Sequence, residues 1–386
     1  MGQWADFEVK LNERFLERRA EVRAVLVSLI AGAHVLLLGP PGTAKSALAK
    51  AVCQGIGGRF WRTTLTPTAT PDELLGPVSV KRLVEDGVYE RNLDGTLAEA
   101  NVAVIDEVWK CNSATLNCLL SVLNEREVRN GTKIVPIPLR TLIGTSNEMP
   151  QEDGLEALWD RFGLRLQVRE IRDPAHFAAI LRMDRGTCAA SGPTLSEVEA
   201  AGGLLDQIRW DEQTFVQLWD AAARWKIPVS TRRWETCLAL CRANALLENR
   251  TEVTTDDLPL LADALWQEPP QRGAIRHGIL DIIHPALAEA EELYDTADEQ
   301  QGIATEALRA WNQPDAKTQE LTAKVSEAIA KLRKTILRLQ ELVDIAHGQG
   351  RATADIETIL TTVRTIHQQI SAAMVNHSLN ILGPAF

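Results

Sequence analysis

A short loop between a strand and a helix constrains this chain of 386 residues more than any other feature. "HVLLL" is an apolar run typical of a strand that is buried on both faces of a parallel sheet. It leads into "GPPGTAKS", and "SALAKAVCQGI" continues with helical character. A phosphate-binding loop has the pattern Gly, four residues, Gly-Lys and then Ser or Thr, placed between a strand and a helix. The segment fits this pattern except at Ala44, where the second glycine is expected.

Ala44 leaves three interpretations: a broken loop, a coincidence, or a variant loop that still holds ATP. Glycine is useful where φ is positive or where the backbone approaches a ligand closely, so an alanine costs little if φ at Ala44 is negative. We therefore predict an intact loop in which Lys45 contacts the β- and γ-phosphates and Ser46 binds Mg²⁺. The predicted nucleotide-binding residues are Gly39, Pro40, Pro41, Gly42, Thr43, Ala44, Lys45, Ser46 and Ala47.

An acidic motif follows the loop in the order that an ATPase needs. "VAVIDEVWK" is an apolar strand that ends in Asp106 and Glu107. An aspartate at a strand end can hold the water shell of Mg²⁺, and the adjacent glutamate can act as a general base toward water. In isolation such a pair is more often a solvated turn, but its place after the loop favours ATP hydrolysis. The strand "LIGTSN" ends in Asn147, which fits either a group that orients the γ-phosphate or a turn cap.

The pattern along the chain predicts an α/β fold with a parallel sheet, followed by helices. We expect a nucleotide-binding core at residues 1–172, a helical lid at 173–270 and a helical extension at 271–386. Local signals predict particular elements: a capping box at Thr70 with Glu73, a hairpin turning at Asn130-Gly131, and a helix start at Asp173-Pro174. "TTDDLPLLADALW" is predicted to form one capped helix.

The extension has the pattern of long packed helices. Apolar residues from Leu321 to Val343 approximate a heptad repeat, "HGQGR" interrupts it, and similar spacing resumes up to Met374. This predicts a long antiparallel helical hairpin, which could either pack as an extension or project as an arm toward a partner.

Composition limits the class of protein. The net charge of −11 and the absence of a basic run argue against a nucleic-acid partner. No apolar run approaches the about 20 residues that span a bilayer, and the first residues lack a signal pattern, so we expect a cytoplasmic protein without a membrane segment. The six cysteines include no Cys-x-x-Cys pair, which predicts reduced, buried thiols and no zinc site.

Four motifs together resemble the MoxR-type AAA+ ATPases, and the RavA-like branch in particular. They are "GPPGTAKS", "VIDEVWKCNSATLNCLLSVLNERE", "GTSNEMP" and "LEALWDRF", and the resemblance covers roughly residues 8–270. It implies an AAA+ P-loop αβα sandwich with a helical lid, an alanine that is accepted in the loop, and hydrolysis of ATP with Mg²⁺ held by Ser46 and Asp106.

The resemblance also assigns roles that spacing alone does not. Arg161 matches an arginine finger that reaches the ATP of the next subunit, and Arg165 is a second candidate. Arg232 matches the sensor arginine of the lid, with Arg233 as the alternative. Without the resemblance, each of these arginines would be read as a surface or ion-pairing group.

The family further implies a homohexameric ring and a partner with a von Willebrand A domain. Segments 76–91 and 127–137 resemble family insertions that we expect to face a partner. Residues 271–386 leave no room for the β-sandwich insertion of RavA, so their role is not assigned by analogy.

Three functions fit these features. The first is an ATP-hydrolysing ring chaperone that remodels or assembles a protein partner. The second is a nucleotide-dependent assembly scaffold with little turnover, and Glu107 argues against it because a binding switch needs no general base. The third is a nucleic-acid motor, which the acidic charge disfavours.

Overall fold

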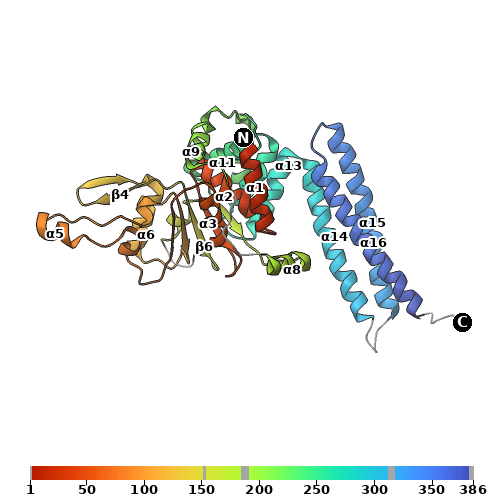
Figure 1. Cartoon of the computed structure of the whole chain (residues 1–386). Coiled ribbons are helices and arrows are strands. Elements are labelled where there is room, and N and C mark those ends of the chain that lie inside the picture. The colour runs from red at the N-terminus through yellow and green to blue at the C-terminus, as the bar shows by residue number, and fades with distance from the viewer. Residues whose placement is uncertain (1, 151–153, 184–190, 312–317, 382–386) are drawn as a thin grey trace. The chain divides into compact units, whose positions relative to one another are not determined.

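The computed structural model describes residues 2–150, 154–183, 191–311 and 318–381. The chain divides into two compact units, Met1–Arg272 and Gly273–Phe386 (Figure 1).

A parallel sheet forms the centre of the first unit. In the described residues it has five strands in the order β2-β3-β6-β1-β7. They are β1 (His34–Leu38), β2 (Phe60–Thr64), β3 (Val102–Asp106), β6 (Thr141–Ser146) and β7 (Phe162–Gln167). All the pairings are parallel, so the carboxyl ends of the strands meet at one edge, where α/β sheets bind ligands. The predicted α/β class with a parallel sheet is confirmed.

Three of these strands were expected from their apolar runs, and two were not. The predicted strands β1, β3 and β6 occupy the middle of the sheet, where nearly every residue is buried. The edge strand β2 is only half-buried and reads "FWRTT", which lacks an apolar run. The strand β7 is interrupted by Arg165, a charged residue inside a buried strand.

Helices cover the sheet and continue into the rest of the first unit. Among them, α2 contacts β1 and β7, while α3 contacts β2 and β3. Figure 1 shows the hairpin of β4 and β5 beside α5 at one end of this unit. The remaining elements are α1 (Gly2–Arg14), α2 (Arg19–Ala31), α3 (Lys45–Gly55), α4 (Pro71–Leu75), α5 (Val80–Asp86), η1 (Leu97–Glu99), α6 (Ser113–Glu125), β4 (Glu127–Asn130), β5 (Lys133–Pro136), α7 (Glu156–Trp159), α8 (Pro174–Arg182), α9 (Leu195–Gly203), η2 (Leu205–Gln207), α10 (Glu212–Arg224), α11 (Thr231–Leu247), η3 (Thr255–Leu261) and α12 (Ala262–Leu265).

The local signals in the sequence have the expected outcome at three positions and a different one at a fourth. Thr70 and Glu73 form the capping box of α4, Asp173 caps α8, and Gly131 takes a positive φ in the β4–β5 turn. The segment predicted as one capped helix is instead the 3₁₀ helix η3 followed by the short α12. Pro259 lies inside η3, and its missing N–H removes a bond that a continuous α-helix would need.

The second unit is a bundle of long helices. It contains α14 (Pro285–Ala310), α15 (Thr318–Gly348) and α16 (Ala354–Ile381), after α13 (Gln271–Ile283), which begins at the boundary. The predicted hairpin corresponds to α15 and α16, but α14 contacts both of these helices and completes the bundle. The ion pair of Arg338 with Glu289, at 2.6 Å, joins α15 to α14. No helix in the described ranges combines the length and apolar character needed to cross a membrane.

The described cysteines are buried as expected at Cys53, Cys111, Cys237 and Cys241, whereas Cys118 is half-buried. Burial raises the pKa of the Cys53 and Cys237 thiols to about 12, so both stay protonated and weakly reactive at neutral pH. Cys188 lies outside the described residues.

His34, at the start of β1, makes the stability of this unit pH-dependent. Its Nδ1 accepts a hydrogen bond from the backbone N–H of Leu142 at 3.1 Å, so Nε2 carries the proton toward the carbonyl of Leu123 at 3.3 Å. Burial, with a smaller effect of Arg126, lowers the pKa of His34 to about 3. Between about pH 3 and about pH 6.5, His34 is protonated in the unfolded chain and neutral in the folded chain. Stability should therefore fall as the pH falls through this window.

We predict that His34→Gln, which keeps a donor and an acceptor, flattens this dependence. Between about pH 6.5 and 5, the free energy of unfolding of the wild type should lose up to about 1.4 kcal/mol per pH unit from His34, and the variant should not. Urea unfolding followed by tryptophan fluorescence measures both slopes. His347→Gln, on the exposed side of α15, is the matched control. Equal slopes for wild type and His34→Gln would contradict the account.

Candidate functional site

The phosphate-binding loop begins at Gly39, directly after β1. Its backbone N–H donates to the carbonyl of Ser146 at 2.9 Å, which ties the loop to the end of β6. A Cβ atom at this position would lie 2.2 Å from the carbonyl oxygen of Val168. Only glycine fits such a close approach, so the first glycine of the motif is fixed by the packing of the loop against the segment after β7.

Ala44 adopts a conformation that sequence reasoning did not anticipate. Its φ is 64° and its ψ is 16°, in the left-handed region, so the condition under which an alanine would cost little, a negative φ, is not met. A residue with a Cβ atom in this region costs about 1–2 kcal/mol, which explains why glycine is the usual residue here. The loop nevertheless closes: the carbonyl of Ala44 accepts a hydrogen bond from Leu48 at 3.0 Å, and α3 begins at Lys45.

Lys45 folds back over the loop. Its Nζ donates to the carbonyls of Gly39 at 2.6 Å and Pro40 at 2.9 Å. Burial lowers the pKa of this amine, whereas the nearby carboxylates of Asp106 and Glu107 act in the opposite direction. The ammonium is thus held by loop carbonyls that it can exchange for phosphate oxygens.

Asp106 collects donors from three other elements. Its Oδ1 accepts from Ser46 Oγ at 3.0 Å and from Thr145 Oγ1 at 2.6 Å, and its Oδ2 accepts from Arg62 Nε at 2.7 Å. The hydroxyl of Ser46 and the carboxylate of Asp106 are oxygen ligands of the kind that Mg²⁺ prefers, so the residues fit that ion. Sequence reasoning predicted Ser46 and Asp106 but missed Thr145 and Arg62. Thr145 lies inside the motif "GTSNEMP", but only Asn147 was singled out there, and Arg62 lies outside the motifs.

Glu107 and Asn147 flank this carboxylate at the same edge of the sheet. Asp106 lies opposite Thr145 in the pairing of β3 with β6, so Glu107 and Asn147 follow the ends of adjacent strands. Glu107 has a φ of 55°, and its Oε2 forms an ion pair with Lys110 Nζ at 3.2 Å. The side chain of Asn147 is exposed. The strand pairing therefore brings together the predicted metal ligand, base and amide.

A cavity of about 540 Å³ lies beside the loop. It is lined by Gly42 to Ala44 on one side and by the apolar side chains of Phe15, Leu16, Ile171 and Ile180 on others. The buried Arg18 positions this region, since it donates to the carbonyls of Thr43 at 3.3 Å and Arg169 at 2.6 Å. An apolar cavity next to a phosphate loop suits a purine ring. The apolar residues of this cavity were not predicted, because they lie outside the motifs, in segments far apart in the chain.

The candidate arginines separate into buried and accessible groups. Arg165 is fully buried, with its guanidinium 4.7 Å from the centre of the Trp159 ring, so it serves the interior and is a poor candidate for a finger. Arg233 is also buried and donates to the carbonyl of Phe162 at 2.6 Å and to Asp160 Oδ1 at 2.9 Å. The accessible candidates are therefore Arg161 and Arg232.

Arg161 lies two residues after the end of α7 and is half-buried. Its guanidinium forms a 3.5 Å ion pair with Asp160. Burial lowers the pKa of Arg161, and the neighbouring charge of Arg232 lowers it further, so the two accessible arginines lie within electrostatic reach of each other. Arg232 itself is exposed at the start of α11.

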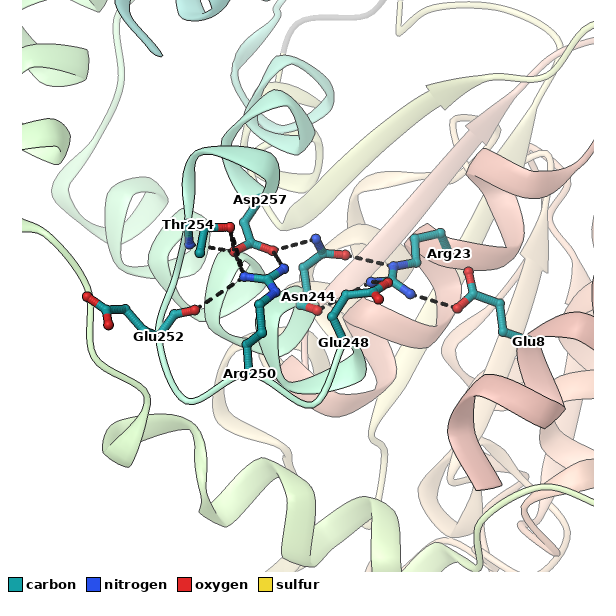
Figure 2. Close-up of polar contacts among 8 residues, drawn as sticks. All are labelled: Glu8, Arg23, Asn244, Glu248, Arg250, Glu252, Thr254 and Asp257. Carbon is teal, nitrogen blue, oxygen red and sulfur yellow. Dashed lines mark hydrogen bonds and ion pairs between the residues drawn. The ribbon is translucent and has the colours of Figure 1, made fainter. Parts of the chain in front are cut away.

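A polar network ties the lid to the first two helices (Figure 2). Arg23 of α2 donates to Asn244 Oδ1 at 2.7 Å and pairs with Glu248 at 2.6 Å, both at the end of α11. The amide of Asn244 in turn donates to the fully buried Asp257 of η3 at 2.7 Å. The network connects residues of four elements and one loop: Glu8, Arg23, Asn244, Glu248, Arg250, Glu252, Thr254 and Asp257. The two helices that flank the cavity-lining residues Phe15, Leu16 and Arg18 are therefore linked to the lid.

Comparison with known proteins places this site in a family. Residues 4–201 match the family described as the MoxR domain in the MoxR-vWA-beta-propeller ternary systems, and residues 214–279 match an AAA lid domain. An uncharacterised protein of Methanocaldococcus jannaschii is 33% identical over 291 residues, which cover 75% of this chain and 76% of that protein. Chaperone MoxR1 of Mycobacterium tuberculosis is 28% identical over 48% of this chain and 48% of its own length.

A solved structure agrees on the fold. A crystal structure of a candidate ATPase from Cytophaga hutchinsonii has a TM-score of 0.60 and 19% identity, and the alignment covers 73% of this chain and 94% of that one. The parallel sheet, the phosphate loop, the acidic strand end and the lid occur together with these similarities. The chain therefore belongs to the MoxR family of chaperone-like AAA+ ATPases.

Proposed function

We propose that this chain hydrolyses ATP with Mg²⁺ in a ring of identical subunits and uses the cycle to remodel or assemble a protein partner. The observation that carries the proposal is the convergence of Lys45, Ser46, Asp106 and Glu107 at the carboxyl ends of β1 and β3, beside an apolar cavity.

The chemistry of the proposed site follows from these positions. Lys45 exchanges the loop carbonyls for oxygens of the β- and γ-phosphates, and Ser46 and Asp106 hold the metal. Mg²⁺ supplies neutralisation of the charge that builds up on the phosphates. Glu107 releases Lys110 and polarises the attacking water as a general base. Asn147 is positioned to orient that water or the γ-phosphate.

We propose that the site is completed by a neighbouring subunit. Arg161 has only the long ion pair with Asp160 as its ionic contact among the described residues, and it lies near Arg232. As an arginine finger it would reach the ATP of the next subunit, while Arg232 senses the nucleotide of its own. Such a contact joins two different surfaces, and repeated around an axis it closes a ring, for which we propose six subunits.

The proposed partner contains a von Willebrand A domain. Support comes from the description of the matched family, which names MoxR, vWA and beta-propeller components of one ternary system. The RavA-like branch stays a prediction, because the comparisons do not distinguish branches.

The two insertions are the proposed contact with that partner. They are joined, since Arg91 N–H donates to Asn130 Oδ1 at 2.6 Å and Asn130 Nδ2 donates to the carbonyl of Arg91 at 3.0 Å. Each insertion exposes a large apolar side chain, Val84 in the first and Ile134 in the second, and Figure 1 shows α5 and the β4–β5 hairpin at the same end of the unit. Exposed apolar side chains grouped on one surface mark sites of protein contact.

The alternative function is a nucleotide-dependent scaffold with little turnover. It predicts that ATP and a non-hydrolysable analogue give the same assembly while no phosphate is released.

We predict that Glu107→Gln slows ATP turnover by about 10²–10⁴ without loss of ATP binding, because it removes only the base. The variant should accumulate as an ATP-bound assembly, measured by phosphate release and by particle mass. Lys45→Ala should lose nucleotide binding itself. Turnover that survives Lys45→Ala would show that the site is misassigned, and a wild type without turnover that assembles equally with both nucleotides would favour the scaffold.

Arg62 should compete with the metal for Asp106. Arg62→Gln removes this competitor, so the Mg²⁺ concentration for half-maximal binding of a fluorescent ADP analogue should fall about two- to fivefold, the effect expected for one exposed ion pair. The control is Arg59→Gln, since Arg59 pairs with Glu99 and not with Asp106. A half-maximal concentration that is unchanged or higher in Arg62→Gln would exclude the competition.

Arg161→Ala should lower turnover by about 10³ or more and keep ATP binding. Mixing it with Lys45→Ala should restore part of the activity, because subunits without nucleotide can still supply Arg161 to a neighbour. Mixing it with the double variant Lys45→Ala/Arg161→Ala should restore nothing. Equal activity in the two mixtures would show that Arg161 does not act between subunits.

A further inference from the structure

The lid carries a groove that plays no part in the nucleotide chemistry. It lies between α10 and α11 and encloses a cavity of about 350 Å³. Its lining has no residue in common with the cavity beside the phosphate loop. The side chains that decide its chemistry are four aromatic rings and two carboxylates: Trp210, Phe215, Trp219, Trp234, Glu212 and Glu235.

The aromatic walls differ in exposure: Phe215 is buried, Trp210 and Trp234 are half-buried, and Trp219 lies largely on the surface. The helix α10 turns Phe215 and Leu218 inward, but it leaves Trp219 57% and Val216 51% exposed. The rings of Trp210 and Phe215 meet edge to face, with centroids 5.2 Å apart, so one wall is already ordered. A large aromatic side chain that stays on the surface beside a cavity, as Trp219 does, is typical of a site that binds another molecule.

The two carboxylates make the groove favour a positively charged group. Glu212 and Glu235 are both exposed, and within the described chain neither forms an ion pair. A guanidinium or ammonium group is attracted both to the face of an indole ring and to a carboxylate. Arginine suits this combination best, because its planar group stacks on aromatic rings while it donates to a carboxylate.

We propose that this groove binds a segment of a partner protein in which an arginine or lysine is flanked by apolar side chains. The stem of the basic residue lies against the tryptophan rings, its charge lies at Glu212 and Glu235, and the apolar neighbours fill the remaining walls. The site goes beyond the proposed ATP hydrolysis, since none of its residues belongs to the nucleotide site. It is therefore tested without nucleotide.

The test compares two peptides that differ in one residue. The probes are the acetylated, amidated peptides Leu-Ala-Arg-Leu-Leu and Leu-Ala-Gln-Leu-Leu, titrated calorimetrically into the full chain. The arginine peptide should bind about tenfold more tightly, which corresponds to about 1.4 kcal/mol. The double variant Glu212→Gln/Glu235→Gln should remove this preference. Trp219→Ala should weaken the binding of both peptides.

Two controls show whether a change in binding comes from the groove itself, from the total charge of the chain or from a loss of folding. Glu299→Gln removes one exposed carboxylate of α14 in the other unit and should leave the preference intact. The three substituted lid residues are exposed, and circular dichroism confirms that each variant is folded.

Two results would overturn the proposal. One is equal affinity for the two peptides, or a preference that persists in the double variant. The other is loss of binding of the arginine peptide when the chain assembles with ATP, because the groove would then be covered by a second copy of the chain.

Discussion

The carboxylate of Asp106 is the point through which the parts of the nucleotide site are held together. It receives the hydroxyl of Ser46 from α3, the hydroxyl of Thr145 from β6 and the guanidinium of Arg62 from β2, while it ends β3 itself. A buried or half-buried carboxylate needs such donors to be stable, and each donor fixes one element relative to the others. The same carboxylate is the proposed metal ligand, so binding of the metal would rearrange contacts of three elements at once.

Much of the fold was readable from the sequence because its central elements are uniformly apolar. The strands β1, β3 and β6 are buried on both faces, and their sequences show it. The strand β2 was missed because an edge strand needs no apolar run. The strand β7 was missed because the buried Arg165 interrupts its apolar run. Residues 271–386 were expected to be helical, but α14 was not predicted as a separate long helix, because its buried positions are mostly alanines, which carry a weak periodic signal.

The site was predictable where a motif is continuous in the chain and not where the fold assembles it. The motifs predicted the loop and the acidic strand end. They did not predict the left-handed φ of Ala44, which depends on how the loop turns into α3. Arg161 and Arg165 were both candidates for the finger from the sequence, and the burial of Arg165 against aromatic rings removes the second candidate. The contacts of Arg23 with α11 likewise join residues over two hundred positions apart (Figure 2). These contacts connect the lid to α1 and α2, the helices beside the cavity next to the phosphate loop.

The most direct test of the central claim is whether a loop with alanine at position 44 holds a nucleotide. Calorimetric titration of the wild-type chain with ATP in the presence of Mg²⁺ measures this without any assumption about turnover or assembly. The account predicts one site per chain, a dissociation constant between about 1 μM and 1 mM, as is usual for substrates, and weaker binding when the metal is chelated. A titration without detectable binding at these concentrations would contradict it, because the geometry of Lys45, Ser46 and Asp106 would then serve no nucleotide.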